Sequence, residues 1–238
     1  MRIDIANSEM FSTIFESILG SKIYHPIAGL TNDSRQVERG DLYIAVDGKN
    51  NDGHEFLDEA KEKGAVAALV NKINNDFDLQ QIKVKDTIES IKRVAIKWRQ
   101  NFDIPIVAIT GSNGKTSSKD LLVHILSENF EVHATKGNFN TTIGLCFTLF
   151  GLQPHHDLAI VELGASMPGE IKNLCSIALP THGLITNIAP AHLEGFGSIE
   201  NIAREKGDLF RALNDGISFV NMADDHISKI DIKGEKIS

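Results

Sequence analysis

The sequence has few cysteines and no long hydrophobic run, and each absence excludes a class of protein. Cys146 and Cys175 are the only two cysteines, and they form no CxxC motif. A disulfide-rich secreted scaffold is therefore excluded, and both thiols are expected to be reduced core residues of a cytoplasmic protein. No apolar stretch approaches the roughly 20 residues that cross a bilayer. The first residues include Arg2, Asp4 and Glu9 and form no signal peptide, so we expect no membrane insertion.

Basic residues are scarce relative to acidic ones. The chain has 24 Lys plus Arg against 32 Asp plus Glu, a formal net charge of −8. A general nucleic-acid-binding protein usually carries a basic surface, so this balance argues against nucleic acid as a partner. Hydrophobic residues make up 42% of the sequence and charged residues 24%, which is typical of a globular protein. A chain of 238 residues can form one large domain or two modest ones.

The sequence changes character near residue 103, where we predict a boundary between domains at 1–103 and 104–238. The motif Asp103-Ile104-Pro105 ends a helix predicted over residues 87–102, because the residue before a proline avoids the helical conformation. The first domain is predicted to be mixed α/β. Its clearest elements are strands at residues 42–46 and 65–70 and a helix at residues 55–63 that Gly64 closes.

Strands and helices alternate in the second domain. Predicted strands lie at residues 106–109, 158–161, 183–188 and 218–221, and predicted helices at residues 117–129, 141–150, 169–177 and 199–213. This alternation predicts a doubly wound parallel sheet with helices on both faces. The sequence stops at Lys236-Ile237-Ser238, within what resembles another strand. We therefore expect the sheet of the second domain to be truncated.

A glycine-rich loop, TGSNGKTS at residues 110–117, lies between strand 106–109 and a helix. Backbone N–H groups in such a loop and at the helix N-terminus can bind phosphate oxygens. In that arrangement Lys115 would lie against the β- and γ-phosphates, and the Thr116 hydroxyl would bind Mg²⁺. Phosphate contacts are predicted at Gly111, Ser112, Asn113, Gly114, Lys115, Thr116 and Ser117.

The loop departs from the strict GxxxxGK[ST] motif, since Ile109 occupies the position of the first glycine. The alternative interpretation is an ordinary glycine turn with a solvated lysine. The apolar strand before the loop and the amphipathic helix after it favour phosphate binding, because that chemistry requires this structural context.

Two further polar side chains are predicted at the same edge of the sheet. Strand 158–161 is followed by Glu162, and strand 183–188 is followed by His192. Parallel α/β sheets bind ligands at the carboxyl ends of their strands, so both side chains should lie near the phosphate loop. Carboxylate and hydroxyl oxygens suit Mg²⁺. Glu162 could instead balance a helix dipole, and His192 could be a hydrogen-bonded loop histidine.

Several segments resemble the Mur ligase family, and together they extend over nearly the whole chain. In the second domain they are Gly111–Ser117, Gly137–Gly144 (GNFNTTIG), Val161–Ala165 (VELGA) and Ala191–Gly197 (AHLEGFG). In the first domain they are Asp33–Arg35, Gly40-Asp41 and Asp52–His54. The resemblance implies an N-terminal mixed α/β UDP-binding domain, followed by a P-loop-type ATP-binding domain with a doubly wound parallel sheet.

The resemblance implies an ATP-dependent ligase of peptidoglycan precursor synthesis, with ATP and Mg²⁺ as cofactors. In such enzymes ATP phosphorylates the terminal carboxylate of a UDP-N-acetylmuramoyl peptide, and an amine attacks the acyl phosphate to form an amide. Gly137–Gly144 and Ala191–Gly197 favour the member that adds D-Ala-D-Ala to UDP-N-acetylmuramoyl-tripeptide over the member that adds the third amino acid. A monomer is expected.

The resemblance also implies roles for single residues. Lys206 aligns with the lysine that Mur ligases carry as a carbamate. The implied catalytic residues are Lys115, Glu162, His192 and Lys206, and the implied metal ligands are Thr116, Glu162, His192 and Lys206. The implied substrate contacts are Ser34, Arg35, Asp52 and His54 for UDP, and Asn138, Asn140 and Thr141 for the muramoyl peptide. Lys206 could instead be a solvated helix lysine, and Ser34 and Arg35 could form a turn with a surface ion pair.

The family carries a third, C-terminal domain that closes over ATP and positions the incoming amine. We therefore expect this chain to be a fragment of the ligase that is poorly active alone. Two other classes of function stay open. A non-catalytic nucleotide-sugar-binding module would lack the metal-site residues, yet Thr116, Glu162 and His192 are present. A small-molecule kinase using the same loop would not depend on a UDP-sugar.

Overall fold

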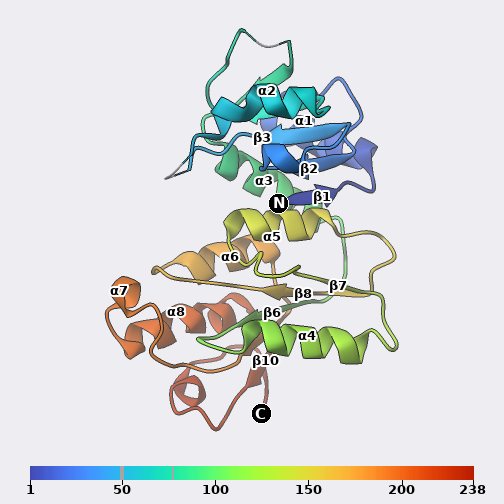
Figure 1. Ribbon diagram of the computed structural model, residues 1–238. Coiled ribbons are helices and arrows are strands. Elements are labelled where there is room, and N and C mark those ends of the chain that lie inside the picture. Colours follow the sequence, from blue (N-terminus) through green and yellow to red (C-terminus); the bar gives the residue numbers. More distant parts are fainter. Residues whose placement is uncertain (49–50, 77) are drawn as a thin grey trace. The chain divides into compact units, whose positions relative to one another are not determined.

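The computed structural model describes residues 1–48, 51–76 and 78–238 (Figure 1). They divide into two compact units. Unit 1 comprises Met1–Asn101 with Leu149–Gly151, and unit 2 comprises Phe102–Thr148 with Leu152–Ser238. Within the described ranges, every helix is too short or too polar to cross a membrane.

Unit 1 is built on a five-stranded mixed sheet in the order β1-β2-β3-β4-β5. Its strands are β1 (Arg2–Asp4), β2 (Gly29–Thr31), β3 (Asp41–Ile44), β4 (Ala67–Val70) and β5 (Gln80–Lys83), and its helices are α1 (Ser8–Leu19), α2 (Leu57–Glu62) and α3 (Thr87–Arg99). A short 3₁₀ turn, η1 (Ser34–Gln36), follows β2, and a second, η2 (Gly53–Phe56), precedes α2. β1 pairs antiparallel to β2, and the other pairs are parallel. The mixed α/β character predicted for this part of the chain is confirmed.

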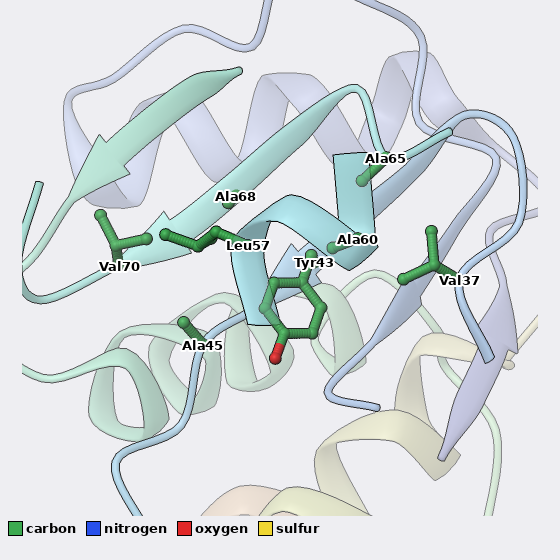
Figure 2. Close-up of a cluster of buried hydrophobic side chains, with 8 residues drawn as sticks. All are labelled: Val37, Tyr43, Ala45, Leu57, Ala60, Ala65, Ala68 and Val70. Atoms are coloured by element: carbon green, nitrogen blue, oxygen red, sulfur yellow. The ribbon is translucent and has the colours of Figure 1, made fainter. Parts of the chain in front are cut away.

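The central strands of unit 1 are buried and largely apolar. All four residues of β3 and all four of β4 are buried, as expected for parallel strands covered on both faces. Figure 2 shows helix α2 lying against these strands, with its Leu57 and Ala60 beside Tyr43 and Ala68. Full burial of a side chain such as Leu57 contributes about 2 kcal/mol.

Unit 2 is built on a six-stranded, wholly parallel sheet in the order β11-β10-β9-β6-β8-β7. Its strands are β6 (Ile106–Thr110), β7 (Val132–Ala134), β8 (Leu158–Glu162), β9 (His182–Ile185), β10 (Ile217–Val220) and β11 (Glu235–Ile237). The helices are α4 (Lys115–Leu126), α5 (Thr142–Phe150, which ends in unit 1), α6 (Glu170–Ala178), α7 (Leu193–Phe196) and α8 (Ile199–Ala212), with a 3₁₀ turn η3 (Ile227–Lys229). The predicted parallel sheet is confirmed, and β7 and β11 complete its six strands.

Helices α4 and α8 cover opposite faces of this sheet. Leu184 of β9 packs with Ile109 and Ile160 on the face where α4 contributes its apolar residues. The preceding residue, Gly183, faces Leu209 and Leu213 around α8. Because neighbouring residues of a strand point to opposite faces, the two helices cannot share one. The sheet is therefore doubly wound, and β6, which lies between β8 and β9, is the strand at which the order reverses.

Candidate functional site

The glycine-rich loop lies at the carboxyl end of β6, where the strand order reverses and open α/β sheets bind ligands. Gly111 and Gly114 have φ values of +149° and +77°, which non-glycine residues rarely adopt. Gly114 is the N-cap of α4, so the loop runs directly into the helix. The first N–H groups of a helix have no partner inside it and carry partial positive charge. The loop and α4 together can therefore bind an anion such as phosphate.

Lys115 is the first residue of α4, and its side chain folds over the loop. Its Nζ donates to the carbonyl oxygen of Gly111 at 2.8 Å and lies 3.5 Å from that of Ser112. These neutral acceptors hold the ammonium group beside the helix N-terminus without neutralising its charge. A phosphate bound at this N-terminus could form a charge-assisted hydrogen bond with the Lys115 ammonium group.

Glu162, at the end of β8, lies beside the same helix N-terminus. The residue is 2% exposed, and its carboxylate accepts hydrogen bonds from Thr116 Oγ1 and Asn140 Nδ2, each at 2.8 Å. The N–H of Glu162 donates to Thr135 Oγ1 at 3.0 Å. Glu162 thus lies beside the phosphate loop, as the sheet-edge argument predicts, and hydrogen bonds fix both its backbone and its carboxylate. Asn140, implied as a contact of the peptide substrate, donates to this carboxylate.

His192 and Lys206 lie in different surroundings from Thr116 and Glu162. His192 is exposed, has a φ of +50° and caps the short helix α7. With Ser166, Met167, Leu193, Glu194 and Gly195 it lines a cavity of about 530 Å³. Across the described residues, no three His, Cys, Asp or Glu side chains are arranged to hold a metal ion. The hydrogen bonds therefore join two of the four implied metal ligands, Thr116 and Glu162.

Lys206 is only 3% exposed on α8, so the alternative of a solvated helix lysine is wrong. Burial and the positive charge of Lys115 lower the pKa of Lys206 to about 8, against the opposing effect of Glu205. The Glu205 carboxylate accepts the N–H groups of Gly169 and Ile171, each at 2.7 Å. It therefore caps the N-terminus of α6 beside the buried lysine.

Unit 1 contains a separate cavity of about 650 Å³ at the carboxyl ends of β2 and β3. Among the implied UDP contacts, Ser34 and Arg35 line it. Ser34 donates to Glu59, and the guanidinium of Arg35 pairs with Asp33 at 2.8 Å. The Arg35 side chain is 79% exposed, so the predicted alternative of a turn with a surface ion pair describes the observed geometry.

Tyr43 lies in the wall of this cavity and donates its hydroxyl to the carbonyl oxygen of Gly53 at 2.9 Å. Burial, with the negative charges of Asp33, Glu59 and Asp52, raises the pKa of Tyr43 to about 12. The phenol therefore remains a neutral hydrogen-bonding group throughout the physiological range.

Asp52 and His54 form a pair that fixes the loop before α2. His54 Nδ1 contacts Asp52 Oδ1, while His54 Nε2 accepts the N–H of Asn71 at 3.1 Å. Because Nε2 is an acceptor, the proton of the neutral ring belongs on Nδ1. The pair thus bridges this loop to the end of β4, and the contacts give it a structural role at the cavity's edge.

The remaining implied contacts lie on the loop between β7 and α5. Asn138 and Thr141 are exposed there, and the N–H of Asn140 donates to the Asn138 carbonyl oxygen at 2.7 Å. The sequence interpretation missed two segments that contact the site, Thr135 and Thr186–Asn187. Their signal is positional: each directly follows a strand at the carboxyl edge of the sheet.

A glycine-rich loop at the reversal point of a parallel sheet, with a Thr–Glu pair beside it, is typical of α/β proteins that bind nucleotide phosphates. The sequence matches the Mur ligase middle domain over residues 109–237 and the Mur ligase family catalytic domain over residues 26–101. The chain belongs to the Mur ligase family.

Named relatives refine this assignment. The chain is 39% identical over 220 residues to UDP-N-acetylmuramoyl-tripeptide–D-alanyl-D-alanine ligase of Escherichia coli K12, covering 92% of this chain and 48% of the relative. It resembles the crystal structure of MurF from Acinetobacter baumannii with a TM-score of 0.84 and 30% identity, covering 92% and 50% of the two chains. MurF ligase from Thermotoga maritima in complex with ADP gives a TM-score of 0.77 and 31% identity, covering 87% and 49%. The chain therefore spans about half the length of these relatives.

Proposed function

We propose that this chain supplies the UDP-sugar and ATP sites of a ligase that adds D-Ala-D-Ala to UDP-N-acetylmuramoyl-tripeptide, acting as a monomer. The observation that carries the proposal is the loop from Gly111 to Thr116, with Glu162 hydrogen-bonded to Thr116, in a Mur ligase fold. The printed names of the relatives, including one solved with ADP, support this substrate and nucleotide.

The proposed chemistry uses this geometry in two steps. An oxygen of the tripeptide's terminal carboxylate attacks the γ-phosphorus of ATP, and ADP leaves. The amine of D-Ala-D-Ala then attacks the carbonyl carbon of the resulting acyl phosphate, and phosphate leaves and the nitrogen loses a proton as the amide forms. Phosphoryl transfer depends mainly on positioning and on neutralising charge. Lys115 and the helix N-terminus of α4 supply positive charge at the phosphates, and Asn138 and Thr141 are proposed to face the muramoyl peptide.

The donor set beside the loop fits Mg²⁺, which prefers hard oxygen ligands. Thr116 Oγ1 and the Glu162 carboxylate, already 2.8 Å apart, would hold it, and His192 and a carbamate on Lys206 are the further ligands proposed. When bound, Mg²⁺ would neutralise charge on the transferring phosphate. Asn140 Nδ2 donates to the Glu162 carboxylate and Thr135 Oγ1 accepts the Glu162 N–H, and together they keep Glu162 in place.

Replacing Glu162 by glutamine should raise the Mg²⁺ concentration needed for half-maximal ADP binding about tenfold, because the amide has lost the negative charge that attracts the ion. Calorimetric ADP titrations at stepped Mg²⁺ concentrations would measure the shift. Glu128→Gln, at an exposed position after α4, is the matched control. An unchanged Mg²⁺ requirement in Glu162→Gln would contradict the proposed role of Glu162 as a Mg²⁺ ligand and would leave it a purely structural one.

Calorimetric titration of the 238-residue chain with UDP-N-acetylmuramoyl-tripeptide, without ATP, tests the proposed substrate. We expect saturable binding that UDP competes away, because unit 1 carries the proposed UDP cavity. UDP-N-acetylmuramoyl-dipeptide distinguishes the family member that adds the third amino acid, which should prefer it. A folded chain that binds none of these would contradict the substrate assignment.

A further inference from the structure

The segment that leaves β9 holds the phosphate loop through several hydrogen bonds. The N–H of Ser112 donates to the carbonyl oxygen of Asn187 at 3.0 Å, and the N–H of Asn113 donates to Asn187 Oδ1 at 2.9 Å. Thr186 Oγ1 donates to the carbonyl oxygen of Asn113 at 2.6 Å. The Ser112 hydroxyl both donates to and accepts from the backbone of Ala189, at 2.8 and 2.9 Å. Asn187 alone therefore occupies two amides of the loop.

The holding segment is itself anchored by the residues that follow β10. Asn221 Nδ2 donates to the carbonyl oxygen of Thr186 at 3.1 Å. Asp224 Oδ2 accepts the N–H of Ile188 at 2.7 Å. The same carboxylate receives the N–H groups of His226 and Ile227. Hydrogen bonds with Asn221 and Asp224 thus fix Thr186 and Ile188, the residues on both sides of Asn187.

We propose that Asn187 is a positioning residue for the nucleotide phosphates, an inference that rests on the proposed ATP site. It fixes Ser112 and Asn113, so that the loop enters α4 with the amides of the helix's first turn available to phosphate. A loop already held in its binding conformation loses little entropy when the ligand arrives. An amide suits this position because it accepts the Asn113 N–H while adding no negative charge beside the phosphates.

The test compares ADP binding, measured by calorimetry with Mg²⁺ at a temperature where every variant is folded. Asn187→Ala should bind ADP about tenfold more weakly, as expected for one lost hydrogen bond and a released loop. Thr186→Val, which keeps the side-chain shape and removes only the hydroxyl, should weaken binding about threefold. Asn173→Ala is the matched control, because its amide donates to Thr142 Oγ1 at 3.1 Å, away from the loop. It should bind ADP as the parent chain does.

Hydrogen exchange of the ligand-free chain provides a second measurement. Asn187→Ala should accelerate exchange at the amides of Ser112 and Asn113, while Asn173→Ala should not. If Asn187→Ala bound ADP as tightly as the parent chain or more tightly, the positioning role would be overturned. This holds also if the only defect of the variant is a lower melting temperature. A folded parent chain that binds no ADP would instead overturn the proposed ATP site, and the positioning role with it.

Discussion

Replacing Lys115 by alanine should weaken ADP and ATP binding about a hundredfold and leave UDP binding unchanged. The Lys115 ammonium is held over the loop by the carbonyl oxygen of Gly111, beside the N-terminus of α4. Removing a charge that pairs with a desolvated phosphate costs about 3 kcal/mol, which is about a hundredfold in affinity. Two calorimetric titrations, one with Mg²⁺ and ADP and one with UDP, measure both effects.

Lys172→Ala, at an exposed position on α6, is the control for loss of a positive charge, and it should bind both ligands normally. If Lys115→Ala lost both ligands while its circular dichroism was unchanged, the assignment of the two ligands to separate units would be wrong. Lys206 offers an independent readout. Because Lys115 helps to lower the pKa of the Lys206 amine, Lys115→Ala should raise that pKa, which NMR titration of the uncarbamylated Lys206 in carbonate-free buffer would follow.

The sequence was sufficient for features that depend on local order. The phosphate loop follows an apolar strand and precedes a helix, and this order places it at the edge of the sheet where Glu162 also lies. Glu162 was predictable because it ends a strand whose five residues are all buried. The contact between Glu162 and Thr116, residues distant in sequence, then follows from the parallel pairing of β6 and β8.

Features that depend on tertiary packing were not predictable in this way. Lys206 lies between Glu205 and Gly207, which are the sequence surroundings of a surface lysine. Only the packing of α8 buries it. β7 has three half-buried residues and little apolar patterning, so periodicity does not reveal it. Asn187 belongs to no motif used above, because its importance comes from a loop that lies far from it in sequence.

Replacing Gly111 by alanine should reduce ADP affinity at least a hundredfold, for steric reasons distinct from loss of charge. A Cβ at this position would lie 1.9 Å from Thr186 Oγ1, and a φ of +149° already disfavours any side chain. The loop must therefore move away from the segment after β9, and its amides lose their alignment with α4. Calorimetry with Mg²⁺ and ADP measures the loss. Gly137→Ala is the control, because Gly137 also has a positive φ, but no atom of the described residues beyond its chain neighbours lies within 4 Å of the added Cβ.

A double variant separates the overlap from the backbone strain. Thr186→Ala removes Oγ1 and leaves the Cβ of residue 186, which lies 3.1 Å from the added Cβ of residue 111. If the overlap dominates, Gly111→Ala with Thr186→Ala should bind ADP more tightly than Gly111→Ala alone, although Thr186→Ala by itself weakens binding. This reversal of sign is a coupling that independent substitutions would not produce. Additive losses would show that the φ of Gly111, rather than its contact with Thr186, is what requires glycine in the loop.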